Sequence, residues 1–226
     1  VNEVNFIGES ALYRAAHAGH ISSVVSLLRG GASASTGFPC CGSLVYFAAE
    51  RNITLLETLL EEGGSIDARG VLGISPLLRA VKQEDHRVLL VLLEFGASVT
   101  QEYDGGNSIM HLVTDCRSAT MLMEFDAPTT GRNARGLTPL HIAASAGRAD
   151  CLREILNCSR AWQDIDARGA DGLTALHLAV MQEHIPVIQT LLSRGARASA
   201  RGYNGRTAMH IAVEHGAIDA LNILVQ

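Results

Sequence analysis

The feature that most constrains this chain is a four-residue box that recurs along its whole length. Each box begins with Ser or Thr and holds an apolar residue at its third position. Successive boxes start 33, 32, 33, 30, 36 and 33 residues apart, a period typical of repeat arrays. The boxes start at Ser10, Ser43, Ser75, Ser108, Thr138, Thr174 and Thr207. The sequence therefore predicts seven small units in a row.

Two further series keep the same phase. The first is a small or branched apolar pair: Ala15-Ala16, Ala48-Ala49, Ala80-Val81, Leu112-Val113, Ala143-Ala144, Ala179-Val180 and Ala212-Val213. The second is an apolar doublet: Leu27-Leu28, Leu59-Leu60, Leu92-Leu93, Leu122-Met123, Ile155-Leu156, Leu191-Leu192 and Leu224-Val225. Three series in phase indicate one structural unit that is repeated.

Each unit is predicted to hold two short helices and a loop. The Ser or Thr hydroxyl can cap the first helix, and Pro76 and Pro139 suit its first position, where no N–H is needed. The second helix has apolar residues at helical spacing and stops at a glycine such as Gly96 or Gly195. Neither helix can bury its apolar side alone, so we expect the units to stack.

The pattern resembles the ankyrin repeat family. T-P-L-H-I-A-A at 138–144 is the closest match to the family's box, and Gly-Ala follows the second helix at Gly31, Gly96 and Gly195. The resemblance implies an all-α solenoid of helix-turn-helix units joined by hairpin-like loops, with a concave surface made by loops and first helices. It also implies one domain over 1–226, with repeats at 1–34, 35–66, 67–99, 100–129, 130–165, 166–198 and 199–226.

Two units depart from the period, and both ends break off within the repeat pattern. The fourth unit is short, and the spacing from Val113 to Leu122 places the loss between its two helices. The fifth has extra residues around Cys158–Gln163, where Trp162 either packs on the stack or contributes to binding. Neither end resembles a polar capping repeat, so we expect the natural protein to continue in both directions.

Composition bounds the partners and the compartment. The net charge of -5 gives no general attraction to nucleic acid or anionic lipid, so neither is an expected partner. Five cysteines without a C-x-x-C pair argue against a disulfide framework, and no stretch resembles a signal peptide or a membrane span. We therefore expect an intracellular, cytoplasmic location, with the nucleus as an alternative, and a monomer in isolation.

No residue pattern predicts catalysis. His111, His141, His177 and His210 hold the fourth place of their boxes, one repeat apart, and the resemblance implies a structural role within each unit. No set of His, Cys and carboxylates has zinc spacing, and no phosphate loop or nucleophile motif is present. The chain is expected to be no enzyme and to need no metal or cofactor.

Candidate binding residues follow from the implied concave surface. They include residues after the small apolar pair, among them Lys82, Gln83, Met181 and Gln182. Six residues before the box, four of five successive units carry arginine: Arg69, Arg132, Arg168 and Arg201. We call these four residues the arginine column. Tyr103, Arg135, Tyr203 and Arg206 lie nearby.

The arginine column has a structural and a functional interpretation. The arginines could be solvated or could pair with Asp67 and Asp166 in the same loops. Alternatively, planar donors beside tyrosines form a common interaction hot spot. The main hypothesis is a protein-interaction or scaffolding module that binds an acidic peptide or surface. The alternatives are a regulatory domain that binds a polyanionic small molecule, a nucleotide or inositol phosphate, and a spacer without a partner.

Overall fold

The structure is a computed structural model that describes residues 2–34, 37–38, 42–70, 73–157 and 164–225. It divides into two compact units, residues 1–98 and 99–226, which we call unit 1 and unit 2. Trp162 and the extra residues of the fifth repeat lie outside the described residues, as do Cys40, Cys41 and Cys158. Within the described residues, no helix is long and apolar enough to cross a bilayer.

Unit 1 consists of helix pairs with one two-stranded hairpin. The elements are α1 (Ala11–His17), α2 (Ile21–Arg29), β1 (Gly37–Phe38), β2 (Gly42–Ser43), α3 (Leu44–Arg51), α4 (Ile53–Glu61), α5 (Pro76–Lys82) and α6 (His86–Glu94). β1 and β2 pair antiparallel, with Gly37 opposite Ser43. The predicted order of first helix, second helix and loop is confirmed here.

Unit 2 repeats this order four times. Its elements are β3 (Glu102–Tyr103), β4 (Asn107–Ser108), α7 (Ile109–Leu112), α8 (Cys116–Glu124), α9 (Pro139–Ser145), α10 (Ala149–Asn157), α11 (Ala175–Met181), α12 (Ile185–Ser193), α13 (Ala208–His215) and α14 (Ile218–Leu224). β3 pairs antiparallel with β4, with Glu102 opposite Ser108. Because the strands are only two residues long, the fold is all-α, as predicted.

Helix starts follow the predicted capping chemistry. Ser10, Ser43 and Ser75 are N-caps, and their side chains accept hydrogen bonds from the backbone N–H three residues later. The second helices α4 and α6 start the same way at Asn52 and Asp85. Such caps satisfy backbone donors that a short helix cannot satisfy itself.

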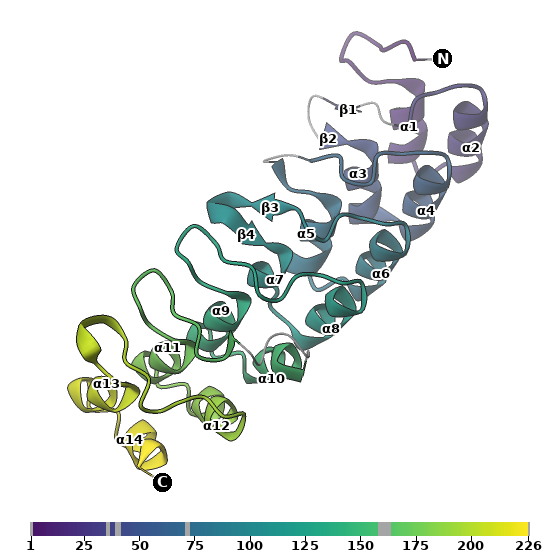
Figure 1. The fold of residues 1–226 in the computed structure, drawn as a ribbon. Helices are drawn as coiled ribbons and strands as arrows, with labels where there is room; N and C mark the ends of the chain where they lie inside the picture. Colours follow the sequence, from purple (N-terminus) through teal and green to yellow (C-terminus); the bar gives the residue numbers. More distant parts are fainter. Residues whose placement is uncertain (1, 35–36, 39–41, 71–72, 158–163, 226) are drawn as a thin grey trace. The chain divides into compact units, whose positions relative to one another are not determined.

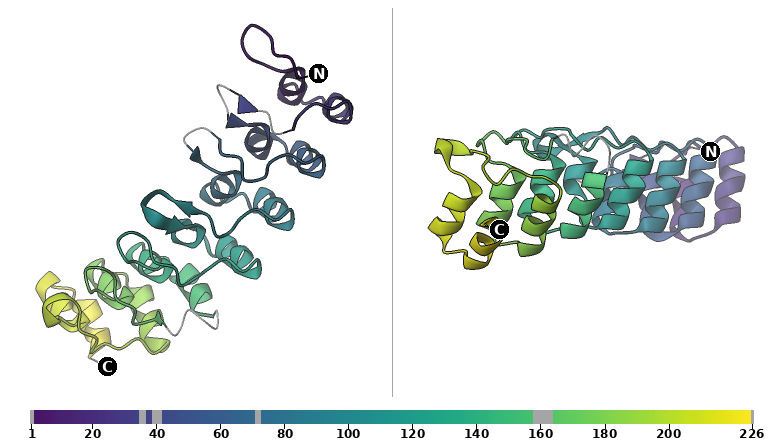
Figure 2. Two further views of the ribbon diagram at one scale, coloured as in Figure 1. Left: turned by 45° about the horizontal axis from the view of Figure 1, so that its top comes forward. Right: turned by 60° about the horizontal axis from the view of Figure 1, so that its bottom comes forward.

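The helices of unit 2 form two layers, which Figure 1 and Figure 2 show from different sides. First helices pack in the sequence α7, α9, α11 and α13, and second helices pack in the sequence α8, α10, α12 and α14. The small apolar pairs lie between the layers, where Ala144, Ala179 and Val180 are fully buried. Alanine at these positions allows the helices to approach closely. Stacking therefore completes the core, as expected.

The contraction of the fourth repeat lies in its first helix, so the prediction that it lies between the helices is wrong. α7 has 4 residues, whereas α5 and α9 have 7. The linker 113–115 is as long as the linker 83–85. A side chain of the next repeat bonds the backbone just after the shortened helix: Arg148 Nη1 donates to the carbonyl of Val113 over 2.6 Å.

Cys151 contributes to the same repair. Its thiol donates to the carbonyl of Thr114 over 3.7 Å. Burial raises the pKa of this thiol to about 11, so it keeps its proton at neutral pH. The carbonyls of Val113 and Thr114, the first two residues after the shortened helix, are thus both bound by side chains of the following repeat.

Three box histidines of unit 2, His111, His141 and His177, connect their repeat to the next one. His141 Nδ1 lies 3.2 Å from the backbone N of Thr138, which can only donate, and His141 Nε2 lies 3.2 Å from the carbonyl of Leu173, which can only accept. The ring must therefore be neutral with its proton on Nε2. His111 and His177 make the same contacts to Leu137 and Arg206. The predicted structural role is correct, but the hydrogen bonds also reach the next repeat.

These contacts predict a stability that falls in acid. Burial lowers the pKa of His111, His141 and His177 below the usual 6.5. The unfolded chain therefore binds protons first as the pH falls below about 6.5, and the free energy of unfolding decreases until the folded pKa is reached. Urea denaturation between about pH 8 and pH 5 measures this dependence.

A substitution separates this effect from general acid denaturation. We expect His141→Gln to lower the free energy of unfolding at neutral pH by about 1–3 kcal/mol, since buried partners lose hydrogen bonds. The same variant should lose less stability than the parent as the pH falls. His20→Gln, at an exposed position, is the control. An equal pH slope in the parent and in His141→Gln would contradict the assignment.

Candidate functional site

The loops before α7, α9 and α11 are joined to each other by backbone hydrogen bonds. Ala134 N donates to the carbonyl of Gly105 over 2.8 Å, and Ala170 N donates to the carbonyl of Arg135 over 3.1 Å. Gly136 has a φ of +67°, and a Cβ atom there would lie 2.8 Å from Ala170 N. Glycine is thus required both by the backbone and by the neighbouring loop. The loops form a connected surface whose side chains have a fixed order.

The arginine column takes part in this loop structure. Arg132 Nη1 donates to the carbonyl of Gly136 over 2.8 Å and to that of Arg168 in the next loop over 2.6 Å. In unit 1, Arg69 Nη1 donates to the carbonyl of Gly73 over 3.2 Å. Two guanidinium groups of the column therefore stabilise loops and have fewer donors to offer a ligand.

The aspartates of the loops have other partners. Asp67 Oδ1 accepts a hydrogen bond from Ser98 N over 3.1 Å. Asp166 binds Arg197 twice, through the backbone N at 2.9 Å and through Nε at 2.8 Å. These carboxylates link their loop to the following one, in place of the expected pairing with the arginine column.

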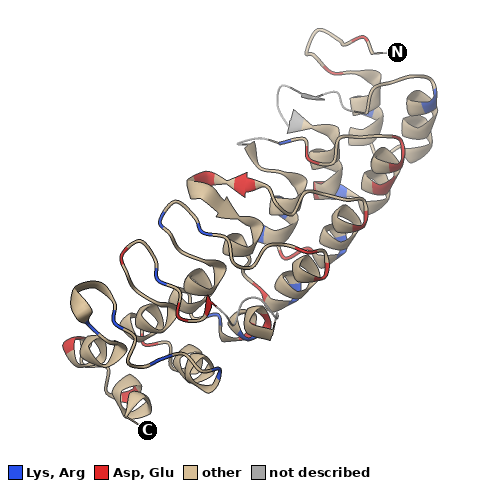
Figure 3. Ribbon diagram, in the orientation of Figure 1, with Lys and Arg blue, Asp and Glu red and all other residues tan. Residues whose placement is uncertain are grey.

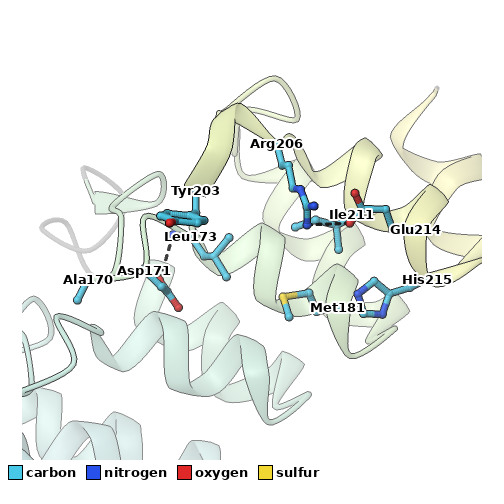
Figure 4. Close-up of a pocket in the computed structure, with 9 residues that line it drawn as sticks. All are labelled: Ala170, Asp171, Leu173, Met181, Tyr203, Arg206, Ile211, Glu214 and His215. Atoms are coloured by element: carbon cyan, nitrogen blue, oxygen red, sulfur yellow. Dashed lines mark hydrogen bonds and ion pairs between the residues drawn. The ribbon is translucent and has the colours of Figure 1, made fainter.

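A groove of about 350 Å³ opens in unit 2 between the last two repeats. Figure 4 shows its side chains, which come from the loops before α11 and α13 and from these two helices. Leu173, Met181 and Ile211 supply apolar surface, and Tyr203 at the loop tip is 68% exposed. The remaining lining residues are Ala170, Asp171, Arg206, Glu214 and His215.

The groove has a charged pair at its rim. Arg206 Nη1 lies 3.0 Å from Glu214 Oε2, and both side chains are about half exposed, at 52% and 45%. On the other side, Asp171 Oδ1 accepts from the backbone N of Leu173 over 3.1 Å, which fixes the turn. An apolar floor with a few polar groups at the edge is the usual arrangement of a binding site.

The groove unites three of the predicted site residues: Met181, Tyr203 and Arg206. Gln182 follows Met181 as the exposed C-cap of α11. The loop arginines Arg135, Arg168 and Arg201 are exposed on the loops of the same unit.

The other predicted residues lie elsewhere. Tyr103 is half-buried in β3 of unit 2. Arg69, Lys82 and Gln83 belong to unit 1, where all three are exposed. They contribute nothing to the groove, which unit 2 forms alone.

Sequence reasoning missed two residues of the groove floor. Leu173 directly precedes the Thr174 box, and Ile211 directly follows the box histidine His210. The same positions hold Leu137 and Ile142 in the fifth repeat, so the sequence signal for these floor residues was an apolar residue on each side of the box. This signal does not distinguish a groove from the core, because apolar residues beside a helix start usually belong to the core.

Charge on these loops differs from that of the whole chain. Residues 130–137, 166–173 and 197–206 hold six arginines and two aspartates, although the chain has a net charge of -5. Figure 3 shows the basic positions along the loops that precede α9, α11 and α13. The loop surface next to the groove is therefore basic.

The contacts of Arg132 predict a stabilising role that its neighbour lacks. Arg132→Ala removes two hydrogen bonds to carbonyls, each worth about 0.5–1.5 kcal/mol, and the exposed site favours the lower end. We expect the free energy of unfolding to fall by about 1–2 kcal/mol in urea denaturation. Arg135→Ala, which removes an exposed arginine from the same loop, should change it by less than about 0.5 kcal/mol. Equal effects of the two variants would show that the contacts of Arg132 contribute nothing.

Comparison with known sequences agrees with the fold. The profile of ankyrin repeats (3 copies) matches residues 110–202 and 154–226, which together cover more than half of the chain. The chain is 31% identical over 162 residues to the nuclear factor NF-kappa-B p105 subunit of Gallus gallus, covering 68% of this chain and 16% of the relative. It is 32% identical over 136 residues to the B-cell lymphoma 3 protein of Homo sapiens, covering 57% of this chain and 30% of the relative.

A third relative has an enzyme name. The E3 ubiquitin-protein ligase XBAT32 of Arabidopsis thaliana is 29% identical over 195 residues, which cover 70% of this chain and 38% of the ligase. The chain thus spans well under half the length of each of these relatives. Ankyrin repeats are in general protein-interaction modules rather than enzymes. Phased boxes, stacked helix pairs and the matching profile together show that the chain belongs to the ankyrin repeat family.

Proposed function

We propose that this chain is a scaffolding or interaction module that binds a partner protein through the groove and the neighbouring loops of unit 2. The observation that carries the proposal is the convergence of Met181, Tyr203 and Arg206 in one groove with an apolar floor. These residues come from two successive repeats; Met181 is a candidate through its place after the small apolar pair, and Tyr203 and Arg206 through their nearness to the arginine column. Exposed apolar surface with a polar rim is typical of protein-binding sites.

The chemistry of the groove favours a protein segment over a polyanionic small molecule. Its volume is at the lower end of the range for ligand pockets, about 300–1000 Å³, and its floor offers Leu173, Met181 and Ile211. A nucleotide or inositol phosphate needs clustered donors in the pocket itself, yet Arg206 is the one arginine among the described residues that line the groove, and it is paired with Glu214. An apolar side chain of a partner matches this floor directly.

The proposal extends to the setting in which the module works. We take it to act as a monomer without metal or cofactor, and with a protein rather than nucleic acid or membrane as its partner. The free thiols of Cys116 and Cys151 support a reducing compartment, the cytoplasm or the nucleus.

A random-peptide display library tests the site because it offers many sequences and assumes no particular partner. Peptides enriched on the parent chain should bind Met181→Glu at least about tenfold more weakly, because a charge in the apolar floor costs on the order of 1.4 kcal/mol or more. The control Gln189→Glu places the same residue on an exposed position of α12, outside the groove. Circular dichroism of both variants confirms that they are folded.

The result that would overturn the proposed site is equally direct. If the enriched peptides bind Met181→Glu and Gln189→Glu with the same affinity as the parent, the groove does not bind them. Fluorescence anisotropy with each labelled peptide gives the three dissociation constants that decide this.

A further inference from the structure

We propose that the partner segment is an extended acidic stretch that places one large apolar side chain in the groove and two carboxylates, three residues apart, on Arg168 and Arg201. This inference rests on the proposed function and names the chemistry of its ligand. It follows from the charge of the loops, from the spacing of the repeats and from the shape of the groove.

Three of the six loop arginines are available to bind a negatively charged ligand. Arg197 is paired with Asp166 and Arg206 with Glu214. Arg132 donates to two carbonyls. Within the described residues, the other three form no ion pair and are exposed: Arg135, Arg168 and Arg201. A ligand that meets this surface therefore gains most if it is negatively charged.

The repeat sets the distance between two of these arginines. Arg168 and Arg201 each lie six residues before the Thr of their box, at Thr174 and Thr207, so they hold equivalent places in successive repeats. The first helices α11 and α13 pack side by side, and packed helices lie about 8–10 Å apart. A peptide extended in the polyproline II conformation advances about 3.1 Å per residue with three residues per turn, so side chains three apart point the same way and lie about 9 Å apart.

The loops that carry these arginines also line the groove, which can take an apolar side chain. The same two loops that carry Arg168 and Arg201 continue into the groove, where Leu173 and Tyr203 lie beside Met181 and Ile211. A peptide that crosses these loops thus passes the opening of the groove. Its apolar side chain can be buried there while its carboxylates stay at the exposed arginines, which is the common pairing of an apolar anchor with a charged rim.

The groove also argues for an extended ligand rather than a helix. A bound amphipathic helix presents anchors at i, i+3, i+4 and i+7, and these need a long apolar trough. The groove has an apolar floor of three side chains, Leu173, Met181 and Ile211, which suits a single anchor. Carboxylates seven residues apart on a helix would also span about 10 Å, so the spacing found by experiment separates the two.

The test uses the peptides selected by display on the parent chain. Their shared pattern should contain two acidic residues three apart and one large apolar residue. Arg168→Glu with Arg201→Glu should weaken binding at least about tenfold at low salt, and less at high salt. Peptides in which both acidic residues are replaced by Lys should bind this double variant better than they bind the parent.

The control makes the same change in net charge at two positions away from the groove. Arg117→Glu with Arg194→Glu alters two exposed arginines on α8 and at the end of α12, away from the groove, and should leave binding near that of the parent. The inference is supported if the Lys peptides bind the Arg168 and Arg201 double variant and do not bind the Arg117 and Arg194 double variant.

Three results would overturn it, and they separate it from the proposed function. Peptides that depend on Met181 but not on either arginine refute the acidic ligand and leave the groove as the binding site. Acidic residues seven apart in a helical peptide refute the extended form. Peptides that depend on neither Met181 nor the arginines refute both proposals.

Discussion

Every feature of this chain depends on the inability of one helix pair to bury its own apolar surface. α11 and α12 together present apolar side chains toward α9, α10, α13 and α14, and only the neighbours remove these side chains from water. Close stacking requires small residues between the layers, such as Ala144 and Ala179, which are fully buried. The same stacking sets the loops in a row, so the surface proposed for binding is a by-product of the core.

Most of the fold was readable from the sequence because local and repeated signals agree. The Ser or Thr of each box predicted a helix start, and the box histidines predicted a structural bond. The contraction of the fourth repeat was misplaced for a physical reason. Spacing counts residues between two apolar markers but does not say whether a helical turn or a linker is lost. Arg148, which fills the gap, belongs to the next repeat and gives no local signal.

The site was only partly predictable. Repeat phase placed Met181 among the candidates, nearness to the arginine column added Tyr203 and Arg206, and the structure joins the three in one groove. Phase alone does not reveal that Arg132 is bound to carbonyls, because a guanidinium in a loop chooses between backbone oxygens and solvent according to the detailed loop geometry. Leu173 and Ile211 escaped notice for the opposite reason, since they resemble core residues in sequence.

The histidine contacts give the stack a direction. Each ring caps its own helix through Nδ1 but satisfies Nε2 only with a carbonyl from the repeat that follows, as His111, His141 and His177 show. Removing a following repeat takes away the carbonyl acceptor of Nε2 and exposes the ring, the situation of His210, which is exposed and contacts Thr207 of its own repeat. Removing a preceding repeat leaves both contacts of the ring in place. Unfolding that starts at one end of the stack therefore differs in cost from unfolding that starts at the other end. A partner that binds two successive repeats stabilises chiefly the repeat that precedes them.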